Sequence, residues 1–540
     1  MVHSGGKGAG RQMKTVLLAV LCATAWASAV SPSDWYVSPT GDDASDGKAP
    51  GRAFRTIGKA VSVLKAGDTV HLAPGQYAER VTISVSGASD APITIRGSAD
   101  GRTVWTMPLP DPVRWEEKFA LWVKESRFIV VEGITFRDCC AWILLDRSHF
   151  CAVKDCTFDG ARIYNCCRVN SGSHNRFLNC DFVRAVRRTG VRQDMEWAPE
   201  PGADYIEIFR DSHANLVERC RFGEINHVAV SISAVDKTKF LPGSNIVRAC
   251  VFTDPFWKCV WIGAGTRTLI EDNTFSGTSA CFLQLEGSSS VIRYNIFRDY
   301  RDSTGGKPDP TFRGAIRIQY NEAIHNRIFH NLFIDNERAI TNSSFRWEVY
   351  DNIFQNNIFF RNGQTVFLGF PEYRTKNRNF FFGNLMAGTG PEQKVIRLER
   401  DEYTLAEAQE QLPELCRCNI GGDPRLVRDA QGRYTGLSDS SPCIDRGVPL
   451  TVTATAGKGR RLPVKDAWFF FDGAAMIPGD RISVGGDRTA QVLRVDAEAG
   501  ILDLDADVSW SEGEPVTLAR SSAGRAPDIG PFEYVPAKRE

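Results

Sequence analysis

The chain has 540 residues, of which 42% are hydrophobic and 24% charged, so it is neither a disordered polymer nor a single compact domain of about 100–200 residues. Its 65 Lys and Arg residues balance its 65 Asp and Glu residues. Nucleic-acid-binding proteins usually carry a strong basic excess, so this balance argues against a nucleic-acid partner.

Residues 1–29 are predicted to form a secretory signal peptide. Lys7, Arg11 and Lys14 precede an apolar run at 16–26, and the small residues 27–29 offer a cleavage site. The apolar run is too short to span a bilayer, and no later segment is suited to do so. We therefore expect a soluble, secreted or periplasmic protein, and a monomer.

The stretch that follows contains segments 35–43, 53–57, 67–70, 74–77 and 92–95, which read WYVSPTGDD, AFRTI, GDTV, PGQY and PITI. These segments resemble the start of secreted pectin-lyase-like β-helix proteins, a scaffold shared by polysaccharide lyases and glycosidases. The resemblance implies a short helix at about 56–64 that caps the open end of a coil. Asp42, Asp43 and Asp46 could offer oxygen atoms to Ca²⁺, but their spacing matches no complete ion loop, and a turn is the preferred interpretation.

The middle of the chain repeats a short pattern: apolar residues, then Gly, Cys or Asn, any residue, and Phe. The Phe anchors are Phe136, Phe158, Phe182, Phe222, Phe252, Phe275, Phe297, Phe333, Phe359 and Phe381. Their minimum spacing is 22 residues, and the segments between them have strand-like rather than helical periodicity. This pattern predicts an all-β fold, a right-handed parallel β-helix over 30–447, in which equivalent residues stack about 4.8 Å apart. Cys156, Cys180, Cys220 and Cys250 take the position that Asn takes later, which favours a buried ladder over a metal or redox cluster.

Three long insertions, at 183–203, 234–244 and 298–313, flank one strand of the repeat. That strand recurs at 205–209, 227–231, 259–263, 282–286 and 315–319. Because strand residues alternate between faces, its second and fourth residues should face inward and the other three outward. The predicted outward columns are Tyr205, His227, Cys259, Phe282 and Ala315; then Glu207, Ala229, Trp261, Gln284 and Arg317; then Phe209, Ser231, Gly263, Glu286 and Gln319.

The insertions would rim an elongated groove over these columns, which suits a polymer. Trp261 and Tyr205 offer stacking faces to sugar rings, while Gln284, Glu286 and Arg317 offer polar contacts. The first insertion contains four arginines, Arg184, Arg187, Arg188 and Arg192, a basic patch that favours an anionic glycan, uronic or sulfated. The alternative is a solvated loop whose arginines pair with its own acidic residues.

Two reactions could use these residues. In β-elimination, His227 and Tyr205 would be base and acid, Lys258 an alternative base, and Arg317 a clamp for the substrate carboxylate. In hydrolysis, two carboxyl groups must flank the glycosidic bond. Glu207 and Glu286 lie three turns apart, roughly 14 Å at the strand spacing. Asp211 or Asp236 would therefore have to partner Glu207.

The C-terminal part contains a capping box at 404–407, which predicts a short helix to about Leu412. Segments 422–424, 441–445 and 527–530 resemble the C-terminal part of the same β-helix proteins. Between them, 448–526 is predicted to be a small inserted antiparallel β-domain with strands at 491–495 and 501–505, and 527–540 to return to the β-helix. His325 and His330 fall on a repeat turn and are expected to be hydrogen-bonded rather than metal-bound.

Together these features predict a secreted enzyme that cleaves an acidic polysaccharide, with a lyase placed ahead of a glycoside hydrolase. A non-catalytic glycan-binding or surface protein is the third hypothesis. Ca²⁺ is a possible cofactor, and no metal-ligating residues are assigned.

Overall fold

The structure, a computed structural model, describes residues 32–107, 118–161, 166–185, 204–234, 242–303, 313–319, 323–342, 349–369, 372–388, 390, 392–521 and 524–535. The predicted signal peptide and Arg187, Arg188 and Arg192 of the first insertion lie outside the described residues, as does Asp236. Of that basic patch only Arg184 is described, and it pairs with Asp159.

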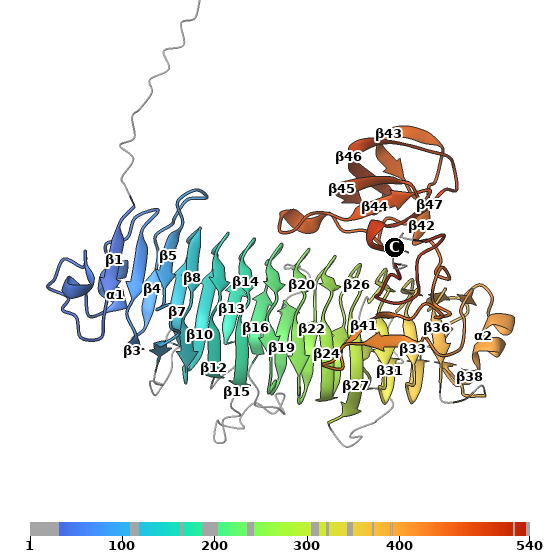
Figure 1. Cartoon of the computed structure of the whole chain (residues 1–540), viewed down its shortest axis with the longest axis horizontal. Coiled ribbons are helices and arrows are strands. Elements are labelled where there is room, and N and C mark those ends of the chain that lie inside the picture. The colour runs from blue at the N-terminus through green and yellow to red at the C-terminus, as the bar shows by residue number, and fades with distance from the viewer. Residues whose placement is uncertain are drawn as a thin grey trace, which may run out of the picture.

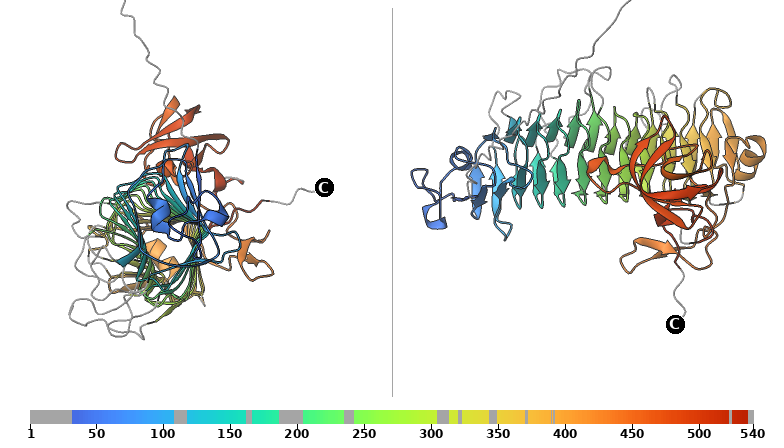
Figure 2. Two further views of the ribbon diagram at one scale, coloured as in Figure 1. Left: turned by 90° about the vertical axis from the view of Figure 1, so that its left-hand side faces the viewer. Right: turned by 90° about the horizontal axis from the view of Figure 1, so that it is seen from above.

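The described chain is built mainly as a rod of three long parallel sheets, seen from the side in Figure 1 and along its axis in Figure 2. Each turn of the rod contributes a strand to every sheet, so neighbours in a sheet are about one repeat apart in sequence. This arrangement confirms the predicted parallel β-helix.

Sheet I has 14 strands: β1 (Asp34–Val37), β2 (Thr69–Leu72), β5 (Ile93–Arg96), β8 (Ile129–Glu132), β11 (Ala152–Lys154), β14 (Arg176–Leu178), β17 (Leu216–Glu218), β20 (Ile246–Arg248), β23 (Leu269–Glu271), β26 (Val291–Arg293), β29 (Arg327–Phe329), β32 (Ile353–Gln355), β35 (Phe380–Phe382) and β39 (Cys416–Arg417). Sheet II has 12: β3 (Gly75–Ala78), β6 (Thr103–Thr106), β9 (Thr135–Arg137), β12 (Thr157–Ala161), β15 (Asp181–Ala185), β18 (Arg221–Phe222), β21 (Val251–Thr253), β24 (Thr274–Ser279), β27 (Ile296–Asp302), β30 (Leu332–Ile334), β33 (Ile358–Phe360) and β36 (Leu385–Ala387). Sheet III has 13: β4 (Val81–Ile83), β7 (Phe119–Lys124), β10 (Ala141–Asp146), β13 (Cys167–Asn170), β16 (Asp204–Phe209), β19 (Val228–Ser233), β22 (Lys258–Ile262), β25 (Cys281–Leu285), β28 (Ile316–Ile318), β31 (Arg338–Asn342), β34 (Gln364–Leu368), β37 (Ile396–Leu398) and β38 (Asp401–Tyr403).

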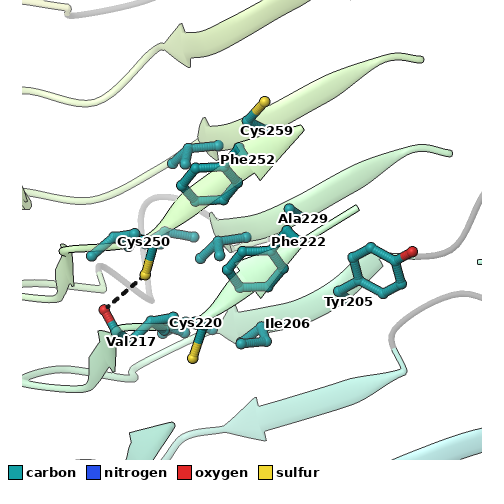
Figure 3. Close-up of a cluster of buried hydrophobic side chains, with 14 of the residues drawn as sticks. Tyr205, Ile206, Val217, Cys220, Phe222, Ala229, Cys250, Phe252 and Cys259 are labelled. Carbon is teal, nitrogen blue, oxygen red and sulfur yellow. Dashed lines mark hydrogen bonds between the residues drawn. The ribbon is translucent and has the colours of Figure 1, made fainter. Parts of the chain in front are cut away.

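The Phe anchors of sheet II form one buried column inside the rod. Neighbouring rings from Phe136 to Phe359 stack with centroids 4.7–5.1 Å apart. Figure 3 shows Phe222 and Phe252 in this column. The prediction of Phe381 as the tenth anchor of this column is wrong. Phe381 lies in sheet I and stacks on Phe354, while Met386 continues the column beyond Phe359.

From Phe158 to Phe359, a Cys or Asn two residues before the Phe closes the turn from sheet I to sheet II. Asn295 donates from Nδ2 to the carbonyl of Ile270, at 2.8 Å, and accepts from the amide of Asn273, at 3.0 Å. In earlier turns Cys takes the position, and Cys250 Sγ lies 3.7 Å from the carbonyl of Val217 (Figure 3). All four ladder cysteines are buried and unpaired by disulfides, which confirms the ladder interpretation.

Sheet III begins at a corner that breaks the two-residue alternation. The amides of Phe282 and Leu283 both donate to the carbonyl of Ala315, so two successive residues face the interior. Tyr205 and Ile206 occupy the same two places, and both belong to the core. The outward orientation predicted for Tyr205 is therefore wrong, as it is for its column mates Cys259, Phe282 and Ala315, which are all fully buried.

Both ends of the rod are covered. At the N-terminal end, α1 (Ile57–Val61) starts at Thr56, whose side chain accepts from the amide of Lys59, and it buries Ile57 and Ala60. The helix is shorter than the predicted 56–64. Near the other end, α2 (Leu405–Gln411) starts with the predicted capping box of Thr404 and Glu407. Asp43 accepts hydrogen bonds from Arg55 and Thr56, as expected for a structured turn.

A six-stranded antiparallel sheet lies against the outer face of sheet I (Figure 1). Its strands are β42 (Thr451–Val452), β43 (Gly457–Pro463), β44 (Arg481–Val484), β45 (Arg488–Asp496), β46 (Ile501–Trp510) and β47 (Pro515–Leu518). We call it the antiparallel unit. Both predicted strands, 491–495 and 501–505, lie in it; the boundaries 448 and 526 of a separate domain stay a prediction.

The chain then returns to the rod. The Gly530 amide donates to the carbonyl of Asn356, at 2.7 Å, and Ile529 packs on the outer face of sheet II beside the hairpin β40 (Leu426–Arg428) and β41 (Tyr434–Leu437). His330 Nδ1 donates to the Gly530 carbonyl, at 3.1 Å, and His325 Nδ1 pairs with Asp351, at 2.5 Å. Both histidines are hydrogen-bonded, as predicted.

Candidate active site

Polar and aromatic side chains gather on the outer face of sheet III, along one register column. Its members are Trp122, Leu144, Arg168, Glu207, Ser231, Trp261, Gln284 and Arg317. The predicted alignment of Trp261, Gln284 and Arg317 is confirmed. The prediction for β19 is wrong by two residues: Ser231, not Ala229, pairs with Glu207, and Ala229 faces the core.

Glu207 forms a covered ion pair with Arg168 of the preceding turn. Arg168 Nε lies 3.0 Å from Glu207 Oε2, and the two side chains are only 11% and 9% exposed. Burial raises the pKa of Glu207 to about 7, against the attraction of Arg168, and the nearby charge of Asp204 raises it further. Glu207 is thus able to gain or lose a proton near neutral pH.

His227 lies immediately before β19 and forms a second pair on this face. Its Nδ1 lies 2.5 Å from Oδ1 of Asp204, and both side chains are largely covered. A carboxylate can only accept, so Nδ1 donates, and in the neutral ring Nε2 is the nitrogen that can take a proton. His227 does not share the predicted outward column with Tyr205, because Tyr205 faces the interior of the rod.

Lys258 begins β22 between two indole rings. Its Nζ lies 5.4 Å from the ring centre of Trp257 and 5.0 Å from that of Trp261. Burial lowers the pKa of Lys258, partly countered by Glu286 and Asp204. A buried amine whose ammonium form is disfavoured is a suitable proton acceptor.

Further along the rod, three predicted binding residues form one network. Trp261 Nε1 donates to Glu286 Oε1, at 3.1 Å, and Gln284 Nε2 donates to the same oxygen. Arg317 of β28 lies next to Gln284 of the neighbouring strand β25. It is four strands from Glu207, as predicted. Glu207 lies in β16 and Glu286 directly follows β25, three strands further along the sheet, so the two form no pair.

Toward the N-terminal end, the column borders an open cavity of about 490 Å³. The cavity lies over β7, β10, β13 and β16, and it is lined by Trp122, Lys124, Leu144, Asp146, Arg147, Arg168, Asn170, Phe209 and Arg210. Four cationic side chains and one carboxylate therefore face it.

Two polar residues of the site, Arg168 and Asp204, were missed from the sequence. Arg168 stands between the inward residues Cys167 and Val169, so the alternation rule, applied one turn earlier, would have placed it outward. Asp204 comes just before the corner of β16, where no simple alternation applies. Among the described residues no cluster of His, Cys, Asp or Glu could hold a metal ion.

Comparison with known families agrees with this fold. Residues 202–359 match a family model described as a right-handed beta helix region. The chain is a right-handed parallel β-helix protein. Residues 39–85 match a family of proteins of unknown function, DUF1565. No curated protein matches the chain, and none of the described helices combines the length and apolar character needed to cross a bilayer.

Solved structures with a similar fold include polysaccharide lyases and a glycoside hydrolase. The PL6 family alginate lyase AlyGC is 15% identical, with a TM-score of 0.49, over 75% of this chain and 55% of the lyase. Pectate lyase Pel9A is 13% identical, with a TM-score of 0.40, over 79% and 94%. The GH136 lacto-N-biosidase from Eubacterium ramulus is 11% identical, with a TM-score of 0.38, over 68% of each chain. This chain spans just over half of the length of AlyGC, and the likeness extends to the fold alone.

Proposed function

We propose that the protein cleaves an acidic polysaccharide on the outer face of sheet III, as a lyase that acts by β-elimination. The observation that carries this proposal is the cationic cavity beside the Arg168–Glu207 pair, the Asp204–His227 pair and Lys258. The predicted signal peptide supports the further proposal that the protein is exported to meet this substrate.

In such a reaction a base removes the proton beside the carboxylate of a uronic acid, and the electrons of that C–H bond form a C=C bond. The glycosidic C–O bond breaks, and its oxygen takes a proton. Nε2 of His227 is the proposed base, with Lys258 as the alternative. Since Tyr205 faces the interior of the rod, Glu207 in its protonated form is the proposed acid, and Arg168 offsets the charge that develops on the substrate.

A glycoside hydrolase is the second candidate, and one observation favours it. Asp204 lies close enough to Glu207 for its charge to raise the pKa of Glu207, so two carboxyl groups stand near each other on this face. A pair of carboxyl groups, one acting as acid and the other as base or nucleophile, is what a glycosidase uses. Among the described residues, Asp204 is the proposed partner of Glu207. Asp211, the partner predicted from the sequence, is exposed at the turn after β16.

The test is a panel of uronate and sulfated polysaccharides with product analysis. Ultraviolet absorbance from an unsaturated sugar identifies a lyase, new reducing ends without it identify a hydrolase, and binding without either identifies a glycan-binding protein. His227→Ala and Glu207→Gln should each lower turnover at least about 100-fold, as expected for loss of an acid or base. Arg221→Ala, which breaks an exposed pair with Asp181 on sheet II, is the matched control and should leave turnover unchanged. Full activity in both site variants would contradict the assignment.

A further inference from the structure

The cavity beside the Arg168–Glu207 pair has the size of a ligand site but little free aromatic surface. Its volume of about 490 Å³ is within the usual range of pockets for small ligands. Lys124 lies over the ring of Trp122, at 5.2 Å, and Arg168 over that of Phe209, at 3.9 Å. Because cations already cover these rings, the cavity is better suited to a charged group than to the apolar face of a sugar.

The charges in the cavity are unbalanced. Asp146 is its single carboxylate, and it accepts from Asn170, at 2.7 Å, and pairs loosely with Arg147, at 3.6 Å. Lys124, Arg147, Arg168 and Arg210 contribute four positive charges. Outside the lining, Glu125 pairs with Arg147 and Glu207 with Arg168, so these two carboxylates and Asp146 leave a net excess of one positive charge. Guanidinium groups bind carboxylate and sulfate groups through paired N–H donors, so the lining favours an anion of that shape.

Arg168 belongs to both the cavity and the reaction centre. It lines the cavity and holds Glu207 through Nε, while its guanidinium carries five N–H donors in all. An anion in the cavity would therefore compete with Glu207 for the positive charge of Arg168. Such competition favours the neutral, proton-donating form of Glu207.

We propose that the cavity binds a carboxylate or sulfate group on a sugar next to the reacting one, and that Arg168 is shared between this group and Glu207. Occupation of the cavity and the protonation of Glu207 are then linked, and an acidic neighbouring sugar activates the site. This inference rests on the proposed function for its biological setting, while its binding test does not require turnover.

The test is titration calorimetry at low salt with glucuronate, glucose 6-sulfate and neutral glucose. The intact protein should bind at least one of the two anions and not glucose, and the preferred anion separates uronic from sulfated substrates. Lys124→Ala/Arg210→Ala should weaken that binding at least about tenfold, since charge-assisted hydrogen bonds are lost. Arg221→Ala, distant on sheet II, should bind like the intact protein.

A separate variant tests whether Arg168 is shared between the bound anion and Glu207. Glu207→Gln keeps the side-chain shape but removes the competing charge, so anion affinity should rise about five- to tenfold. Unchanged affinity in this variant overturns the sharing, and absence of anion binding, or binding that ignores the double substitution, overturns the cavity site. Anion binding without cleavage of any polymer leaves the cavity standing and overturns the proposed reaction instead.

Discussion

His330 is fully buried where the C-terminal tail meets the rod, and its two ring nitrogens have partners that suit only the neutral ring. Nδ1 donates to the carbonyl of Gly530, and Nε2 lies 3.4 Å from the amide nitrogen of Asn356, which is a donor. Burial lowers the pKa of His330 from 6.5 to about 4, and the charges of Arg520 and Arg293 contribute. The C-terminal tail therefore contacts a histidine whose protonation is unfavourable in the folded protein.

This histidine should make stability depend on pH. In the unfolded chain the imidazole takes a proton near pH 6.5, but in the folded protein only near pH 4, so unfolding absorbs a proton between these values. The free energy of unfolding should fall by about 2 kcal/mol from pH 7 to pH 5 through this group. His330→Asn, which tolerates the left-handed backbone at φ 51°, should show a flatter curve of melting temperature against pH. Parallel curves for the two proteins would contradict this role.

At the same scale, the sequence identified some site residues and not their pairing. The two-residue alternation correctly predicts that Glu207 faces outward on sheet III, but it assigns His227 to a column with Tyr205 that does not exist. Their partners Arg168 and Asp204 come from the preceding turn and from a strand start, where contacts depend on how the turns stack. No spacing in a single repeat contains that information.

Among the elements, the strands of sheet III show where alternation stops working. Within a strand it correctly separates Ile206 and Ile208 from Glu207. At the corner, Tyr205 and Ile206 both face the interior, because the chain bends between sheets II and III. The sequence does not mark that bend: Tyr205 in one turn and Cys259 in another occupy the same place, so a tyrosine there reads as an exposed stacking residue.

The Phe column, by contrast, was predictable because a single large side chain recurs with its turn residue. Phe252 lies between Phe222 and Phe275, with ring centres 4.9 and 4.8 Å away. Phe252→Ala should cost about 3–5 kcal/mol, from lost burial and the cavity left in the column. Val251→Ala, one residue away and 40% exposed on the outer face, is the matched control. Thermal unfolding should separate the two variants clearly; equal melting temperatures would show that the column relaxes around the gap.

For the molecule as a whole, the antiparallel unit is joined to the rod by both apolar and ionic contacts. Phe469 packs edge-on against Phe329 of sheet I, at 5.3 Å. Arg293 of β26 binds both oxygens of Asp480, at 2.8 and 2.6 Å, and Glu271 at 2.9 Å. The unit's strands were predictable from local alternation. Its docking place was not, because Arg293 and Asp480 are 187 residues apart in sequence.

The same interface contains a buried and an exposed ion pair, which allows a matched comparison. Asp480→Asn removes one of the negative charges that balance the buried guanidinium of Arg293. Breaking such a buried pair costs about 3–5 kcal/mol of stability. Arg520→Ala removes an exposed pair with Asp272 and the contact of the guanidinium with the Tyr294 ring, 4.1 Å away, each worth about 0–1 kcal/mol. In a calorimetric melt, Asp480→Asn should release the antiparallel unit in an early transition while the rod melts at its original temperature, and Arg520→Ala should shift the trace far less. A single unshifted transition in both variants would mean that the apolar contacts alone hold the unit on sheet I.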